Sequence, residues 1–381
     1  MHLCAWFFSL KGYYDVVIRT AGDQTVLTLD APQANVDFYG FAKEINVKAI
    51  KGESLHIYGS TSKLAVTSGH VEVEDTGIVF ELASNSGSVT NNGYIGEQTS
   101  GTPATGATIG GPYQINSLTR LEAFRDAVNS GNNFADKDVA LTANIELRDG
   151  WRPIGEGSRD VAKSNTVAYG ITTFFAGRFD GQNYTISNLN NKGFVPTSAR
   201  LVPDGDVDTY SYGLFALVDG NAEFRNVKLE RVDFDQDRYA NAKADSVGAL
   251  VGYSRGNITV ENVTVSGSIK GRDAVSGIVG RVNLGANTLV IRNCANHADI
   301  KSDVVASGIA RIYKGAAGHS ATLENNTNDG TITTTNAKDY TAGITVFTQT
   351  NVTLTQSGNT NNGHAATISA VPNTTDNSKL D

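Results

Sequence analysis

The sequence predicts an all-β repeat protein, a parallel β-helix, on three observations. A glycine-led apolar triplet recurs, a short β-prone run ending in asparagine recurs between the triplets, and no convincing helical period appears between residues 213 and 371. The triplets begin at Gly213, Gly248, Gly277 and Gly308, with a fainter copy at Gly343. Their steps of 35, 29, 31 and 35 residues are typical of repeat proteins, in which each unit buries its apolar face against its neighbours.

The recurring asparagines indicate how successive coils meet. They stand at Asn226, Asn262, Asn293 and Asn325, each at the end of a β-prone run and before another short β-prone segment. Asparagine tolerates left-handed backbone angles at a bend, and its amide can hydrogen-bond to the equivalent amide of the next coil. One period is therefore predicted to contain three short strands. An alternation of strands and helices is not expected, because the helices are missing here.

The N-terminal third is β-rich but differs from the later repeats, with short alternating strands between Gly, Asn and Asp turns. A Gly/Thr/Pro-rich stretch, Thr99–Pro112, is the best boundary in the chain. We expect four segments: N-terminal β-rich coils (1–112), a helix with lead-in β-coils (113–212), the repeat coils (213–371) and a polar tail (372–381).

One short α-helix is predicted after this boundary. Ser117 is the expected N-cap and Gly131 the expected stop. Between them apolar residues recur at helical spacing: Leu118, Leu121, Phe124 and Val128. A solitary helix beside a β-helix usually covers an open end or a flank of the stack, so we expect that role for this helix.

Composition excludes some partners. The 381 residues include 40 Gly and carry a net charge of −8, without the basic stripe that nucleic acid or an anionic membrane would require. The apolar first ten residues are too short to span a bilayer, so we expect no membrane span. They lack the basic region and cleavage site of a signal peptide, and we interpret them as a trimmed N-terminus or a first strand. Of the two cysteines, Cys4 and Cys294, the second is expected to be a buried small apolar residue, and we expect a monomer.

An ordered set of motifs resembles the bacterial GLUG-repeat surface proteins over roughly residues 113–345. The lead-in motifs are the runs 124–131, 141–147, 151–155 and 175–189, and the glycine-led triplets from Gly213 onward resemble the GLUG motif itself. The family occurs in large secreted or surface-anchored proteins, including adhesin-like proteins and some named as IgA-specific peptidases. The resemblance implies a right-handed β-helix with an extracellular or bacterial cell-surface location. It implies no catalytic residues, because the repeats are the non-catalytic part of those proteins.

No catalytic residue can be assigned from the pattern. The six histidines are scattered, and no nucleophile elbow appears. Two acidic runs could supply oxygen ligands for Ca²⁺ or carboxylates for sugar chemistry: Asp204, Asp206 and Asp208, and then Asp233, Asp235 and Asp237. The first three are the candidate metal ligands, although solvated loop acids are the simpler interpretation. We expect no cofactor, and Ca²⁺ is the one ion that these acids could bind.

The predicted function is a non-catalytic secreted or cell-surface binding or adhesion module for host or microbial glycans or glycoproteins. The alternatives are a polysaccharide lyase or glycoside hydrolase of the β-helix type, or the non-catalytic part of a larger IgA-peptidase-like protein. Aromatic side chains that could contact a sugar, or could instead pack into the stack, are Tyr210, Tyr212, Tyr239, Tyr253 and Tyr313.

Overall fold

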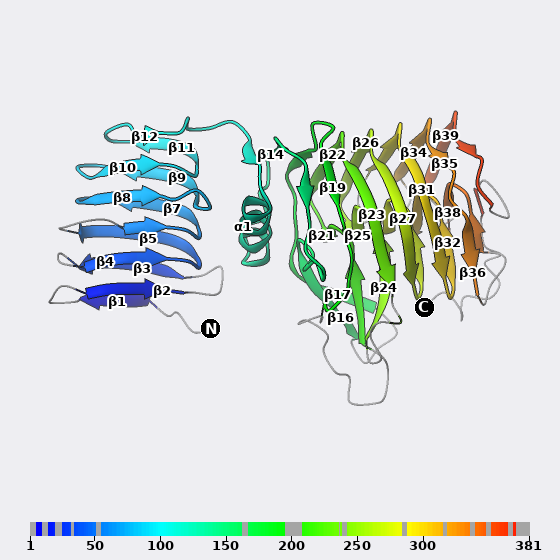
Figure 1. Cartoon of the computed structure of the whole chain (residues 1–381), viewed down its shortest axis with the longest axis horizontal. Coiled ribbons are helices and arrows are strands. Elements are labelled where there is room, and N and C mark those ends of the chain that lie inside the picture. The colour runs from blue at the N-terminus through cyan, green and yellow to red at the C-terminus, as the bar shows by residue number, and fades with distance from the viewer. Residues whose placement is uncertain are drawn as a thin grey trace. The chain divides into compact units, whose positions relative to one another are not determined.

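The computed structural model divides into two compact units (Figure 1). It describes residues 5–9, 14–19, 25–31, 34–50, 55–161, 167–194, 208–235, 237, 242–283, 288–314, 318–335, 340–347, 352–364 and 369–370. The N-terminal unit is Met1–Gln114 with Thr119–Asn132, and the C-terminal unit is Ile115–Leu118 with Asn133–Asp381. Both are built from parallel strands stacked coil upon coil, which confirms the predicted parallel β-helix.

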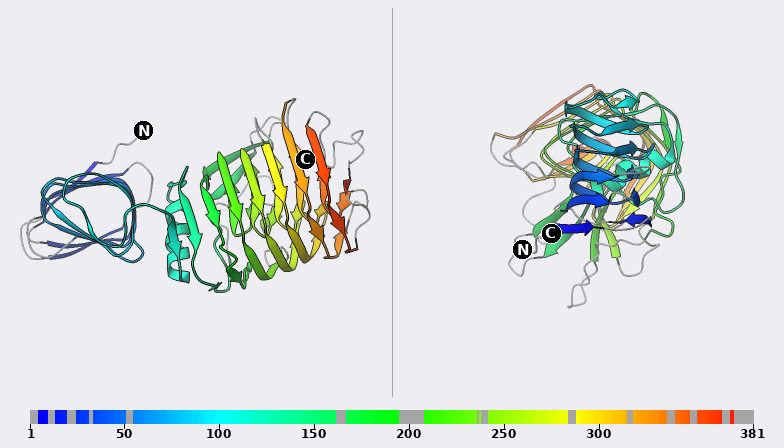
Figure 2. Two further views of the ribbon diagram at one scale, coloured as in Figure 1. Left: turned by 90° about the horizontal axis from the view of Figure 1, so that it is seen from above. Right: turned by 90° about the vertical axis from the view of Figure 1, so that its left-hand side faces the viewer.

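In the N-terminal unit each coil gives one strand to each of two parallel sheets, and the left view of Figure 2 shows these coils along their stack. The first sheet is ordered β1 (Ala5–Ser9), β3 (Val26–Ala31), β5 (Phe41–Ile50), β7 (Ser60–Val66), β9 (Ile78–Ser84) and β11 (Tyr94–Ser100). The second is ordered β2 (Tyr14–Ile18), β4 (Ala34–Phe38), β6 (Leu55–Ile57), β8 (His70–Val73), β10 (Ser88–Asn91) and β12 (Thr105–Gly106).

Strict alternation along these strands separates the core from the surface. In β6, Leu55 and Ile57 are buried, whereas His56 between them is only partly covered. Because parallel strands pair in register, His56 lies beside Asp37 of β4 and Glu72 of β8. Outward side chains from successive coils therefore form columns on the surface of the second sheet.

The helix α1 (Leu118–Asn129) confirms the prediction of one helix at this place. Its buried residues include Leu121, Phe124 and Val128, and Gly131 beyond its end has a φ of 115°. The guanidinium of Arg120 lies 2.8 Å from the carboxylate of Asp75 at a corner of the N-terminal stack. The helix therefore covers a flank of this unit, formed by its coil corners.

The C-terminal unit has four parallel sheets, so a full coil contains four strands instead of the predicted three. In one coil these are β24 (Ala242–Gly248), β25 (Val251–Arg255), β26 (Asn257–Glu261) and β27 (Thr264–Gly271). The missed bend falls on Ala249 and Leu250, inside the triplet itself. Two buried apolar residues make this corner, and nothing in their chemistry identifies a turn.

The remaining strands follow the same four sheets. One sheet is ordered β13 (Tyr113–Ile115), β14 (Asp138–Leu141), β18 (Arg178–Asp180), β22 (Asn221–Arg225), β26, β30 (Thr288–Arg292), β34 (Ser320–Glu324) and β39 (Thr353–Ser357). The next is ordered β15 (Ile145–Glu146), β19 (Thr185–Ser187), β23 (Lys228–Asp235), β27, β31 (Ala295–Ser302), β35 (Thr327–Asn328) and β40 (Thr360–Asn361), with β36 (Ile332–Thr334) also on β31.

The last two parallel sheets flank the triplets. The sheet before each triplet is β20 (Asp208–Tyr212), β24, β28 (Ala274–Ser276), β32 (Val305–Ser307) and β37 (Thr341–Ala342). The sheet after it is β21 (Phe215–Val218), β25, β29 (Val279–Asn283), β33 (Ala310–Lys314), β38 (Thr345–Phe347) and β41 (Ser369–Ala370). An antiparallel hairpin, β16 (Glu156–Val161) and β17 (Val167–Thr173), interrupts the first coils. No described helix is long and apolar enough to cross a membrane.

The triplet glycines are required by close approach of neighbouring coils. A Cβ added at Gly277 would lie 2.2 Å from the carbonyl oxygen of Gly308, and one at Gly308 would lie 1.9 Å from that of Gly343. The φ angles of these glycines are not positive, so lack of space is the reason for glycine here.

The repeat asparagines have a different role. All four lie at bends with φ angles between 54° and 56°: Asn226, Asn262, Asn293 and Asn325. The side-chain amide of Asn262 donates to Oδ1 of Asn226 at 3.1 Å, and Asn226 donates to Asp180 at 3.0 Å. Left-handed backbone and an amide ladder thus occur at the same corner.

A second, buried ladder was not predicted. Nδ2 of Asn296 donates to Oδ1 of Asn328 at 2.7 Å, and Nδ2 of Asn328 donates to Oδ1 of Asn361 at 2.8 Å. A Cβ at Gly277 would lie 2.4 Å from Oδ1 of Asn296. Gly277 therefore leaves room for both the neighbouring backbone and the buried side-chain amides. These amides hydrogen-bond to one another, because an unpaired amide in the core destabilises the fold.

We expect Gly277→Val to reduce the free energy of unfolding by about 3 kcal/mol, because backbone atoms must move to accept the side chain. Leu250→Ala, at a fully buried position, should cost about 2–5 kcal/mol. The exposed control Thr353→Val should change stability by less than about 0.5 kcal/mol. Chemical unfolding of the three variants measures this, and near-neutral values for both core changes would show that the repeat register is misassigned.

Candidate functional site

The N-terminal unit contains a groove of about 370 Å³ between its coil corners and α1. We name it the corner groove. Its wall on the coil side is lined by Tyr39, Gly40, Tyr58, Gly59, Ser60 and Thr76. Its wall on the helix side is lined by Thr119, Glu122, Ala123, Asp126, Ala127 and Ser130.

Two stacked tyrosines form the aromatic part of the corner groove. Tyr39 follows β4 and Tyr58 follows β6, so the coil repeat places one ring above the other. Their centroids are 4.6 Å apart and their planes differ by 4°. Tyr39 is 42% exposed, and the guanidinium carbon of Arg19 lies 4.7 Å from its ring centroid. Burial and the nearby carboxylate of Glu74 raise the pKa of Tyr58, so its hydroxyl stays protonated at neutral pH.

The helix wall supplies carboxylates. Glu122 and Asp126 are one helical turn apart, and both contact the guanidinium of Arg125, at 4.0 and 2.8 Å. Hydroxyl groups of Ser60 and Thr119 add further donors and acceptors to the lining. The corner groove thus combines aromatic surface with many oxygen atoms, and its lining includes neither lysine nor arginine.

The tyrosines singled out from the repeats lie elsewhere. Tyr212, Tyr253 and Tyr313 are buried in the C-terminal unit and pack into the stack. The hydroxyl of Tyr212 donates to the carbonyl of Trp151 at 2.6 Å, and the amide of Asn283 donates to the hydroxyl of Tyr253 at 3.0 Å. The side chain of Tyr210 and all of Tyr239 lie outside the described residues.

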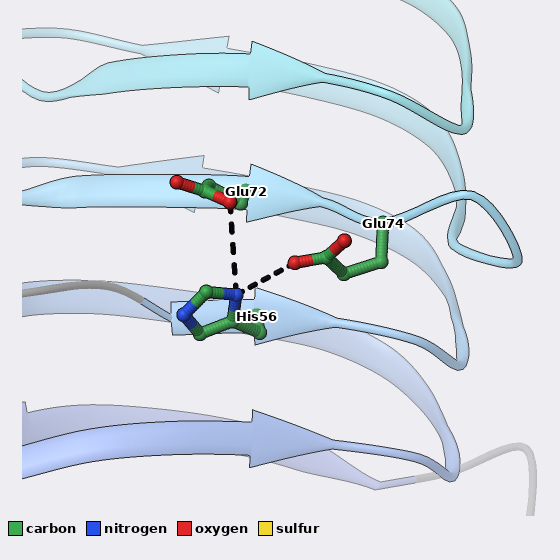
Figure 3. Close-up of side chains that lie close together, drawn as sticks. All are labelled: His56, Glu72 and Glu74. Atoms are coloured by element: carbon green, nitrogen blue, oxygen red, sulfur yellow. Dashed lines mark hydrogen bonds and ion pairs between the residues drawn. The ribbon is translucent and has the colours of Figure 1, made fainter.

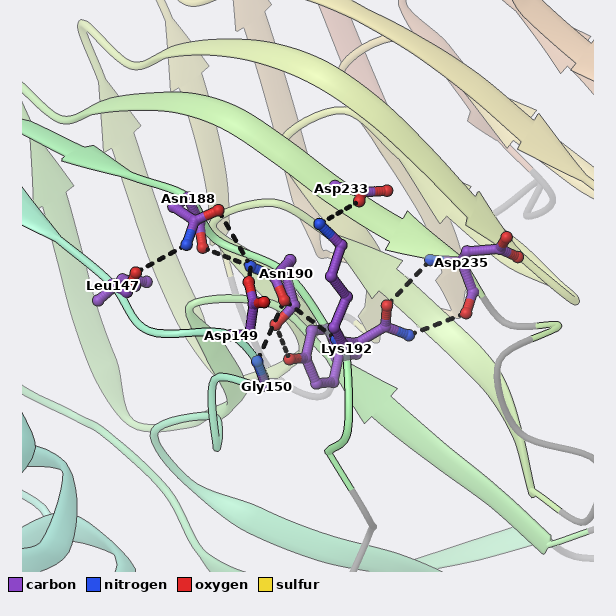
Figure 4. Close-up of polar contacts among 10 residues, drawn as sticks. Leu147, Asp149, Gly150, Asn188, Asn190, Lys192, Asp233 and Asp235 are labelled. Atoms are coloured by element: carbon purple, nitrogen blue, oxygen red, sulfur yellow. Dashed lines mark hydrogen bonds and ion pairs between the residues drawn. The ribbon is translucent and has the colours of Figure 1, made fainter.

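The first acidic run cannot be placed, since Asp204 and Asp206 lie outside the described residues and only the backbone of Asp208, at the start of β20, is described. In the second run, the carboxylate of Asp233 lies 3.3 Å from Nζ of Lys192 (Figure 4). Those of Asp235 and Asp237 both pair with Lys270. These three acids are ion-paired with lysines, which does not suit a Ca²⁺ ligand set.

Figure 4 also shows a polar network around Asn190, whose own side chain is buried. Its Nδ2 donates to Asp149 at 2.9 Å, while its Oδ1 accepts from the backbone N–H groups of Gly150 and Lys192 at 3.1 and 3.0 Å. Both ends of this amide are satisfied by the protein, so the network is structural.

Two other residues with potentially reactive side chains are also buried and have structural roles. Cys294 is buried, and burial raises the pKa of its thiol to about 12, far from a reactive thiolate. Asp273 is buried between the guanidinium groups of Arg281 and Arg311. Burial alone would raise the pKa of Asp273, but the two arginines hold it below its usual value. This core cluster holds two guanidinium groups against one carboxylate, and within the described part of the chain Nε and Nη2 of Arg311 make no hydrogen bond.

No family model matches the chain, so the resemblance to GLUG-repeat proteins stays a prediction. The chain is 32% identical over 195 residues to Halomucin of Haloquadratum walsbyi; the match covers 49% of this chain and 2% of that protein. A solved structure with the name "putative immunoglobulin A1 protease" from Bacteroides ovatus is 14% identical, at a TM-score of 0.33, over 67% of this chain and 78% of the other.

Proposed function

We propose that this chain is a non-catalytic glycan-binding module of a secreted or cell-surface protein, and that the corner groove holds the sugar. The observation that carries the proposal is the stacked pair Tyr39 and Tyr58 facing the carboxylates of α1 across one groove. The 32% identity to a short part of Halomucin supports the proposal that this chain is one segment of a larger repeat protein. The extracellular or bacterial cell-surface location, the glycoprotein partners and the monomeric state belong to the same proposal.

The lining matches the chemistry of a neutral sugar. A sugar ring presents C–H surface, which packs against the exposed edges of the two tyrosine rings, since their faces are covered by each other, by Arg19 and by His56. Its hydroxyls donate to the carboxylates and exchange hydrogen bonds with the hydroxyl groups of the lining. Small-ligand sites enclose about 300–1,000 Å³, so a groove of about 370 Å³ suits a short stretch of a glycan chain. The two carboxylates of the lining are paired with Arg125, so the groove offers hydrogen-bond acceptors without a large excess of negative charge, which suits a neutral sugar.

We expect Tyr58→Ala to weaken binding of a neutral oligosaccharide at least about tenfold, with a similar loss for Tyr39→Ala, because aromatic anchors carry much of the energy of such contacts. Tyr184→Ala is the matched control, since Tyr184 is 37% exposed and lies in the C-terminal unit. A neutral and sialylated glycan array followed by calorimetry measures this. Binding that depends equally on Tyr184, or is absent for every neutral glycan, would contradict the proposal.

The alternative of a glycoside hydrolase is favoured by one observation, the pair Glu122 and Asp126 in the same groove. Such enzymes need one carboxyl group to donate a proton to the leaving group while the other acts as base or nucleophile. Here both carboxylates contact Arg125, an arrangement that suits acceptance of hydrogen bonds from sugar hydroxyls.

We therefore expect no product when the purified chain is incubated with the oligosaccharides it binds, with casein or with immunoglobulin A, with and without zinc. The scattered histidines and the buried Cys294 supply no activated nucleophile in the described part of the chain. Product analysis by mass spectrometry is the measurement, with Glu122→Gln as the comparison. Turnover that Glu122→Gln abolishes would establish the hydrolase instead.

The lyase alternative makes a separate prediction about Ca²⁺. We expect millimolar Ca²⁺ to leave the melting temperature unchanged, because the acids of the second run are already paired with Lys192 and Lys270 and those of the first run are expected to be solvated loop acids. A ligand that binds the folded state would raise the melting temperature, and a chelator would reverse the rise. A Ca²⁺-dependent rise that Asp206→Asn removes would support the lyase alternative.

A further inference from the structure

Three potential metal ligands converge on the outer face of the second sheet of the N-terminal unit. His56 of β6 and Glu72 of β8 are direct partners in the parallel ladder. Glu74 follows β8 directly, and its carboxylate points back toward the imidazole of His56 (Figure 3). The register of two adjacent coils thus brings together an imidazole and two carboxylates that are 16 and 18 residues from it in sequence.

The distances suit one small cation. Nδ1 of His56 lies 2.6 Å from Oε1 of Glu74 and 3.7 Å from Oε2 of Glu72. One ligand atom from each of the three residues lies within 4.8 Å of the other two. Zinc bonds to nitrogen and oxygen of about 2.0–2.2 Å place tetrahedral ligands about 3.4 Å apart. To reach that separation, Oε1 of Glu74 must move away from Nδ1 of His56 by about 0.8 Å and Oε2 of Glu72 must move toward it by about 0.3 Å, which rotations of the partly exposed side chains allow.

The charge of the cluster also favours a cation. In the described part of the chain, Glu72 and Glu74 form ion pairs with histidines and with no lysine or arginine. Nε2 of His70 lies 3.5 Å from the other carboxylate oxygen of Glu72, and Nδ1 of His70 is 2.7 Å from Oγ of Ser88. His70 thereby orients Glu72, as residues behind metal ligands commonly do.

We propose that His56, Glu72 and Glu74 bind one Zn²⁺ ion, with solvent completing its coordination. An imidazole with two carboxylates suits zinc, whereas Ca²⁺ prefers six to eight oxygen ligands. The side chains are 27%, 33% and 21% exposed, so the ion reaches them from solution. The bound ion would link the coils of β6 and β8 and stabilise the N-terminal unit. This inference does not rest on the glycan proposal.

The test is calorimetric titration of the full chain with ZnCl₂ after removal of metal with a chelator. We expect a site that His56→Ala and Glu74→Gln each weaken at least about tenfold. The control is His297→Ala. Nδ1 of His297 lies 2.8 Å from the carboxylate of Asp329, so this histidine pairs with one carboxylate instead of two. No zinc binding, or zinc binding that survives both variants of the cluster, would overturn the proposal.

A second readout guards against misfolded variants. Zinc should raise the melting temperature of the parent chain and of His297→Ala, and not that of Glu74→Gln, by linkage of binding to folding. Glu74→Gln keeps the size of a partly exposed side chain, so its metal-free melting temperature should match the parent's. Tyr58→Ala should lose sugar binding while retaining zinc, which separates this proposal from the proposed function. A zinc-induced rise in melting temperature that Glu74→Gln preserves would contradict the site.

Discussion

The structure depends on the in-register stacking of parallel coils. Adjacent strands lie about 4.8 Å apart, so each residue meets its equivalent in the coils before and after it. Where a corner is tight, this leaves no space for a Cβ, as between Gly277 and Gly308. Where a corner bends sharply, it needs left-handed backbone, which the repeat asparagines supply. The short spacing between coils therefore explains why glycine and asparagine stand at these corners.

Register also governs polar groups in the core. Asn296, Asn328 and Asn361 are buried or partly buried; the amides of the first two each donate to the amide of the following coil, and Asn361 accepts at the end of this ladder. Because a single unmatched amide would leave a buried donor or acceptor unsatisfied, the ladder penalises a slip of one coil against the next. The glycine triplet and the buried ladder are therefore two parts of one packing solution.

The same stacking creates the candidate sites. Residues that point outward at one position of a coil form columns, so Tyr39 meets Tyr58 and His56 meets Glu72. Neither pair is local in sequence. A rigid stack holds such groups at a spacing that the backbone sets, and this gives preorganised contact surfaces at little entropic cost on binding.

These causes explain what the sequence could predict. The glycine triplets, the repeat asparagines and the helical period from Leu118 were sufficient for the parallel stack and its helix, because each signal depends on local backbone geometry. The number of strands per coil was wrong because Ala249 and Leu250 make an apolar corner. The corner groove was not predicted, because the coils of the N-terminal unit repeat at a shorter interval in the sequence than the glycine-led triplets of the C-terminal unit. Tyr39-Gly40 and Tyr58-Gly59, 19 residues apart, were the available signal.

The most direct test of the corner groove is a crystal structure of the full chain at saturating concentration of a neutral oligosaccharide that it binds. The account predicts sugar density between the rings of Tyr39 and Tyr58 and the carboxylates of α1, with Glu122 accepting a hydrogen bond from a sugar hydroxyl. Sugar bound only on the C-terminal coils, with the corner groove containing solvent alone, would contradict it.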